Sequence, residues 1–93
     1  MQITIQYESQ VRRAAGVSSE TIEVPDGCCS VRDCIRTVAA AQGEELKPIL
    51  VNADGEVQPT LLVFLNDSQI VRGTESILSD GDTLTLMTPI SGG

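Results

Sequence analysis

The sequence predicts an α+β fold in which a mixed sheet of four to five strands is covered on one face by one main helix. Three observations lead to this prediction. Residues 3–7 and 83–88, near opposite ends of the chain, alternate apolar with polar side chains, which is typical of half-buried strands. Residues 31–39 carry apolar side chains at helical spacing. Turn sequences rich in Gly, Asp, Asn and Ser separate the remaining apolar segments.

The first two strands are predicted to form a hairpin with a long connection. In the first strand the odd-numbered residues share the core face, namely Ile3, Ile5 and Tyr7. Residues 8–19 break the alternation, and Gly16 with two following serines supplies turn chemistry. Ile22 and Val24 resume the alternation, and Pro-Asp-Gly at 25–27 closes the second strand.

The main helix is predicted to begin at Ser30. Its hydroxyl is placed to cap the first turn, and Asp33 lies where it can reach back and where an acidic group suits the helix dipole. Gly43 supplies the stop. Five apolar residues fall on one stripe: Val31, Cys34, Ile35, Val38 and Ala39. The stripe predicts packing against the sheet and no functional role.

Residues 44–59 carry the weakest pattern. Residues 44–47 predict a helical turn that Pro48 breaks. Asn-Ala-Asp-Gly at 52–55 predicts a turn.

The last third of the chain predicts three further strands. The continuous apolar run at 61–65 fits a strand buried on both faces, or one whose outer face is apolar and open to docking. A turn at 66–68, a short strand at 69–71 and a tight turn at 78–82 lead into the final strand. The order strand, strand, helix, strand, short strand, strand is the β-grasp arrangement.

Composition narrows the classes of function. The chain has 93 residues, which suits one domain, and only 2% are aromatic, so the core must be aliphatic. A net charge of −7 and the scarcity of aromatic residues argue against nucleic-acid binding. The charge fits either a basic protein partner or solubility alone. No membrane span or signal peptide is visible, so a cytoplasmic location is expected.

The cysteines do not suggest a metal site or a disulfide framework. There are three, Cys28, Cys29 and Cys34, and the chain has no histidine. Their spacing matches no common zinc or iron-sulfur pattern. We expect Cys34 to be a buried helix residue and the other two to be turn residues.

The chain end carries the chemistry. Pro89 withholds a ladder donor, so we expect a domain at 1–88 and a flexible tail at 89–93 that reaches about 17 Å when extended. Gly92 and Gly93 bring no side chains, so the tail fits a slot that admits only backbone. Its carboxylate is ionised at neutral pH and could attack the α-phosphate of ATP, giving an acyl-adenylate. The alternative is an ordinary small chain end.

These residues also carry a family resemblance. The turn at 78–82, the alternating strand and the final Pro-Ile-Ser-Gly-Gly resemble the C-terminal pattern of the ubiquitin-like sulfur carriers of the MoaD and ThiS group. Residues 10–16 and 63–66 resemble stretches of the molybdopterin synthase small subunits. The likeness spans the chain but departs at 44–59, which is longer than in typical members and closer to carriers that feed cysteine synthesis.

The resemblance implies a carrier that is not itself an enzyme and binds no cofactor. A ubiquitin-activating-type adenylyltransferase, MoeB-like or ThiF-like, would use ATP to adenylate Gly93, and sulfur would displace AMP to leave a thiocarboxylate. Gly92 would provide steric access, and a MoaE-like synthase large subunit would be the second partner. The predicted partner contacts are Pro89, Ile90, Ser91, Leu62, Phe64 and Leu86, the last three having burial in the core as an alternative.

Molybdopterin synthesis is the pathway that the resemblance favours. Carriers for cysteine or thiamine synthesis share the same chemistry. A ubiquitin-like modifier would use the same tail to form isopeptides with lysines of target proteins. A plain β-grasp interaction module would make no use of the tail.

Overall fold

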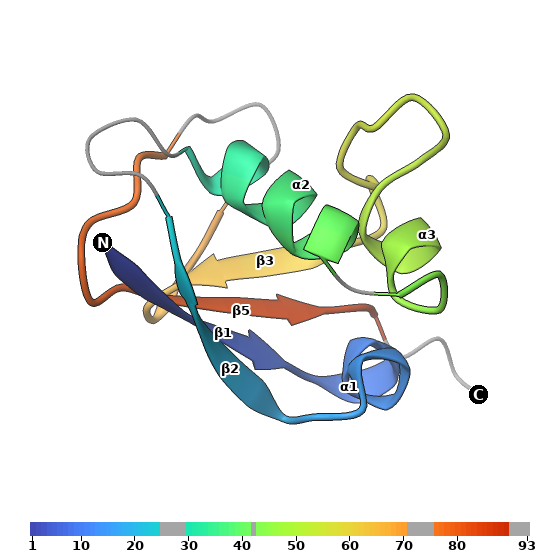
Figure 1. Ribbon diagram of the computed structural model, residues 1–93, viewed down its shortest axis with the longest axis horizontal. Coiled ribbons are helices and arrows are strands. Elements are labelled where there is room, and N and C mark those ends of the chain that lie inside the picture. Colours follow the sequence, from blue (N-terminus) through green and yellow to red (C-terminus); the bar gives the residue numbers. More distant parts are fainter. Residues whose placement is uncertain (25–29, 42, 71–75, 90–93) are drawn as a thin grey trace.

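The computed structural model describes residues 1–24, 30–41, 43–70 and 76–89. Five strands form one mixed sheet in the order β2-β1-β5-β3-β4 (Figure 1). The strands are β1 (Gln2–Tyr7), β2 (Ser19–Glu23), β3 (Leu62–Leu65), β4 (Ser68–Gln69) and β5 (Thr83–Met87). β1 pairs with β2 antiparallel and with β5 parallel, while β3 pairs antiparallel with both β4 and β5. The predicted mixed sheet and its hairpin of the first two strands are confirmed.

The inner face of the sheet forms the core with the main helix, α2 (Val31–Ala41). Ile5 lies opposite Leu84 and Tyr7 opposite Leu86, and all four side chains are fully buried. Figure 1 shows α2 running along one side of the sheet, and all five residues of its predicted stripe are buried. Each large aliphatic side chain removed from water contributes about 1.5 to 3 kcal/mol, so this layer supplies most of the stability.

The start of α2 follows the sequence closely. The Asp33 amide donates to Ser30 Oγ at 3.1 Å, which confirms Ser30 as the capping residue. The helix ends at Ala41, two residues before Gly43, and the Gly43 carbonyl accepts from the amides of Leu46 and Lys47.

The connection between β1 and β2 contains a short helix, α1 (Ser9–Ala15), where the sequence predicted only a turn. The helix has seven residues and buries one, Val11, which is too little for a periodic signal. Its N-cap residue, Glu8, makes no side-chain capping bond. Gly16 does form the expected turn, with a left-handed φ of 78° and its amide donating to the Arg12 carbonyl at 3.0 Å.

A third helix, α3 (Lys47–Leu50), corrects the prediction that Pro48 breaks a helical turn at 44–47, because the helix contains Pro48. Pro48 lies in the first turn, where the missing N–H has no helical partner to lose. The predicted turn at 52–55 is confirmed. Asn52 Oδ1 accepts from the amides of Asp54 and Glu56, at 2.9 and 3.0 Å, and Gly55 adopts a φ of 79°.

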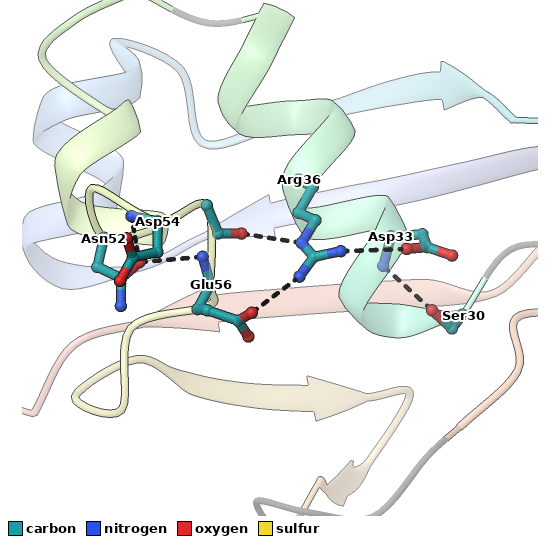
Figure 2. Close-up of polar contacts among 7 residues, drawn as sticks. Ser30, Asp33, Arg36, Asn52, Asp54 and Glu56 are labelled. Carbon is teal, nitrogen blue, oxygen red and sulfur yellow. Dashed lines mark hydrogen bonds and ion pairs between the residues drawn. The ribbon is translucent and has the colours of Figure 1, made fainter.

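Arg36 fastens this turn to α2 (Figure 2). Its Nε donates to the Gly55 carbonyl at 2.8 Å, while Nη2 lies 3.5 Å from Glu56 Oε1 and Nη1 lies 3.8 Å from Asp33 Oδ1. Arg36 therefore holds the turn around Gly55 and Glu56 against the main helix.

One turn follows β3 and another precedes β5, and the two meet at the start of β5. Asn66 has a φ of 54°, and its Oδ1 accepts from the Thr83 amide at 3.1 Å. In the predicted turn at 78–82, the Asp82 amide donates to the Ser79 carbonyl at 3.0 Å and Gly81 has a φ of 88°. The short strand predicted at 69–71 is β4, one residue earlier, and Val71 lies outside the described residues.

Candidate functional site

The site is built around the C-terminal end of β5. This strand lies in the centre of the sheet, between β1 and β3, and its pairing continues to Met87, opposite Leu62. Thr88 is half-buried and Pro89 is exposed. The strand ends before Pro89, as expected for a residue that has no N–H to donate to a neighbouring strand. Ile90, Ser91, Gly92 and Gly93 lie outside the described residues, so the boundary between domain and tail stays a prediction.

The outer face of the sheet is the face turned away from α2. Its residues on the three central strands are Gln2, Thr4 and Gln6 of β1, Thr83, Thr85 and Met87 of β5, and Leu62 and Phe64 of β3. None of these eight side chains is buried. Leu62 lies opposite Met87, and Phe64 lies opposite Thr85. The apolar side chains of the outer face are therefore concentrated beside the end of β5.

Three of the six predicted partner contacts belong to the sheet, and two of these three lie on its outer face. Leu62 and Phe64 are half-buried on the outer face, so the apolar run at 61–65 is a strand with an apolar outer face. Leu86 is 0% exposed and lies opposite Val63 in the core, so its prediction as a docking residue is wrong. The alternation in β5 already placed Leu86 with Leu84 on the inner face.

Met87 is the outer-face residue that the sequence analysis missed. It shares its face with Thr83 and Thr85, which made that side of β5 look polar throughout. The alternation alone could have placed Met87 outside, but only the pairing with Leu62 shows that it extends an apolar patch. We call Leu62, Phe64 and Met87 the outer patch.

α1 lies at the same end of the sheet as the end of β5 (Figure 1). The Glu8 amide, immediately before the helix, donates to the Leu86 carbonyl at 3.0 Å. This bond fixes the start of α1 against the strand that leads into the tail. The two arginines of the last helical turn, Arg12 and Arg13, are exposed.

Metal ligands do not cluster in the part of the chain that the structure describes. No group of three or more His, Cys, Asp or Glu among the described residues could hold a metal ion. Cys34 is a buried cysteine of α2, as predicted, whereas Cys28 and Cys29 lie outside the described part of the chain. None of the described helices is long and apolar enough to span a membrane.

The fold is that of a ubiquitin-like β-grasp protein, and in the sequence a diglycine follows its last strand. The family model described as "ThiS family" matches residues 5–93, and the chain belongs to this family. It is thus a member of the MoaD/ThiS group of ubiquitin-like sulfur carriers.

Known proteins give the same grouping. The molybdopterin synthase sulfur carrier subunit of Chlamydomonas reinhardtii is 31% identical over 100% of both chains. Small archaeal modifier protein 1 of Haloferax volcanii shares 25% identity and superimposes with a TM-score of 0.85 over 100% of both chains. Subunit 1 of the molybdopterin-converting factor of Helicobacter pylori, solved in complex with subunit 2, shares the fold at 22% identity and a TM-score of 0.63 over 100% of both chains.

Proposed function

We propose that this protein is a cytoplasmic sulfur carrier whose terminal glycine, Gly93, is converted to a thiocarboxylate for molybdopterin synthesis. The observation that carries the proposal is the position of β5. The central strand leads through exposed Pro89 into a diglycine end, beside an apolar patch that no described helix covers. The full-length likeness to a molybdopterin synthase sulfur carrier subunit supports the choice of pathway.

The proposed activation has two steps. A carboxylate oxygen of Gly93 attacks the α-phosphorus of ATP, pyrophosphate leaves, and an acyl-adenylate forms on the carrier. A sulfur nucleophile then attacks the acyl carbon and AMP leaves, which gives the thiocarboxylate. Both steps take place in a ubiquitin-activating-type adenylyltransferase, and the carrier contributes the carboxylate and no catalytic base.

Docking is proposed to use the outer patch. Leu62, Phe64 and Met87 offer apolar side chains next to the point where the tail leaves the sheet, so a partner that covers them also receives Pro89, Ile90 and Ser91. Gly92 allows the last residues to pass through a narrow slot. The adenylyltransferase and a synthase large subunit would need the same tail, so we expect them to compete for the carrier.

The test is conversion of the full-length protein by its cognate adenylyltransferase with ATP and a sulfur source. Intact-mass spectrometry should show one oxygen replaced by one sulfur, located in the C-terminal peptide. Absence of this product with every cognate adenylyltransferase that binds the carrier would refute the proposal.

Two tail variants separate chemistry from stability. Deletion of Gly92 and Gly93 withdraws the carboxylate by about 7 Å, so it should abolish adenylation and leave the melting temperature unchanged. Gly92→Val keeps the length but adds a β-branched side chain, so docking should persist while turnover is lost. Normal adenylation of Gly92→Val would show that no narrow slot exists.

A modifier function is the second candidate, because small archaeal modifier protein 1 matches the whole chain with a TM-score of 0.85. In that case an amine of a target lysine attacks the activated acyl carbon of Gly93 and an isopeptide forms. Higher-mass conjugates in cell extract that disappear on deletion of Gly92 and Gly93 would favour this candidate.

A further inference from the structure

The acidic residues at the two ends of the sheet are unequally distributed. Four carboxylates lie at the end where β1 and β5 begin, on Glu23, Asp67, Asp80 and Asp82. Asp80 accepts from the Gln2 amide at 2.7 Å, and Asp82 accepts from Asn66 Nδ2 at 3.2 Å. The N-terminal ammonium lies 3.3 Å from Glu23. Four carboxylates are thus gathered among the described residues of this end.

The end that carries the tail holds two exposed arginines as well as the carboxylates of Glu8 and Glu20. Arg12 and Arg13 occupy the last turn of α1, and both are exposed. Neither forms an ion pair with another described residue, although Glu8 stands one helical turn before Arg12. Two of the six basic residues of a chain with a net charge of −7 thus lie beside the end of β5 without an ion pair among the residues that the structure describes.

Helix stability accounts for only part of this arrangement. Basic residues in the last turn of a helix gain about 0.3 to 1 kcal/mol from the helix dipole, and this gain falls off beyond the turn. α1 has seven residues and is held by the burial of Val11 and by the bond between the Glu8 amide and the Leu86 carbonyl. The helix therefore has other sources of order, and the exposed guanidinium groups are available to a partner.

We propose that Arg12 and Arg13 bind carboxylates of the activating enzyme at the rim of the cleft that receives the tail. The inference rests on the proposed function and specifies the partner surface. Arginine forms strong, directional pairs with carboxylates, which suits the edge of an interface whose centre is the outer patch.

The separation of the two ends makes a local contact effective. The six residues of β1 span about 17 Å at roughly 3.3 Å per residue, whereas the screening length is about 8 Å at physiological ionic strength. The four distant carboxylates therefore act only weakly on a partner at the tail end, where Arg12 and Arg13 are the exposed cations of α1. An acidic rim that contacts these two arginines would favour an approach of the carrier with its tail first.

The experiment compares two variants of the full-length protein with the same net charge. Arg12→Gln with Arg13→Gln removes two positive charges at the tail end, and Arg32→Glu makes an equal change of two charges elsewhere. Arg32 is exposed at the start of α2, on the side of the molecule where the N-terminus lies (Figure 1). Association with the cognate adenylyltransferase is measured by stopped flow at several salt concentrations, and circular dichroism checks that both variants are folded.

We expect the double variant to associate about tenfold more slowly at low salt and to lose most of its salt dependence, since charges at an interface rim act mainly on association rates. Arg32→Glu should stay within about twofold of the wild type, because its change lies outside the contact. Equal slowing of both variants would show that only net charge matters, and an unchanged double variant would show that no such contact exists. Either result overturns the inference.

The kinetics of adenylation separate the other outcomes. A raised KM for ATP with normal carrier association would assign the arginines to the nucleotide phosphates and would also overturn the inference. Failure of the wild-type protein to be adenylated would refute the proposed function itself. Normal adenylation of the wild type and of the double variant, with equal association rates, would remove only the role of the arginines.

Discussion

The inner and outer faces of the β3–β5 pair carry apolar residues in very different surroundings. On the inner face, Val63 and Leu86 are opposite one another and are 7% and 0% exposed. On the outer face, Leu62 and Met87 are also opposite one another, but both are only half-buried. The inner pair stabilises the fold and the outer pair remains available for binding. Substitutions one residue apart should therefore have separable effects on stability and on partner affinity.

The largest expected effect on stability is that of Leu86→Ala. Removal of a fully buried leucine side chain leaves a cavity in the core, so the free energy of unfolding should fall by about 3 kcal/mol in urea titration. Met87→Ala, the adjacent outer-face variant, should lose less than about 1 kcal/mol. Equal losses would contradict the assignment of the two faces.

An intermediate effect on stability is expected from a substitution in α2, the helix that covers the inner face of the sheet. Replacing Cys34 with Ala should lower the free energy of unfolding by about 1 kcal/mol, because the thiol is fully buried.

A variant in which Cys28, Cys29 and Cys34 are all replaced should still form the thiocarboxylate, since the sulfur is carried on Gly93. A folded triple variant that cannot transfer sulfur would indicate a cysteine relay.

The smallest effect on stability is expected on the outer face, with Phe64→Thr. Threonine keeps a high strand propensity, so the free energy of unfolding should change by at most about 1 kcal/mol. Loss of the aromatic anchor should weaken binding to the adenylyltransferase about tenfold, as measured by calorimetry. Thr21→Ala, on the exposed part of β2 far from the outer patch, is the control and should bind normally. Unchanged affinity of Phe64→Thr would remove the outer patch from the interface.

The sequence predicted the elements whose periodic pattern is long enough to show. The alternation of β1 and the stripe of α2 each predicted a set of core residues, and the structure confirms that all of them are buried. The alternation of β5 predicted a strand there, which the structure also confirms. The short helices escaped detection because α1 buries a single residue, Val11, and because Pro48 suits a helix start as well as a break.

The sequence predicted an apolar docking surface beside the tail, but it identified only some of the residues on that surface. Leu62 and Phe64 were identified from an apolar run, which does not reveal which residues face outward. Leu86 was assigned to docking and Met87 was overlooked, although the period of two separates them. Met87 extends the outer patch because it pairs with Leu62, which lies on a strand distant in sequence. The alternation within β5 cannot reveal this pairing, since it depends on the register between the two strands.

The central position of β5 has a consequence for the order of events during synthesis. β1, made first, finds its parallel partner only when Thr83–Met87 has left the ribosome, about 80 residues later, and β3 must wait for the same strand. A chain interrupted before Met87 has an open gap in the middle of its sheet, with unpaired edges on both sides that invite aggregation or degradation. A molecule can therefore complete its sheet only after all of β5 has been synthesised. Chains that stop short of this strand lack both the finished sheet and the residues that follow Met87.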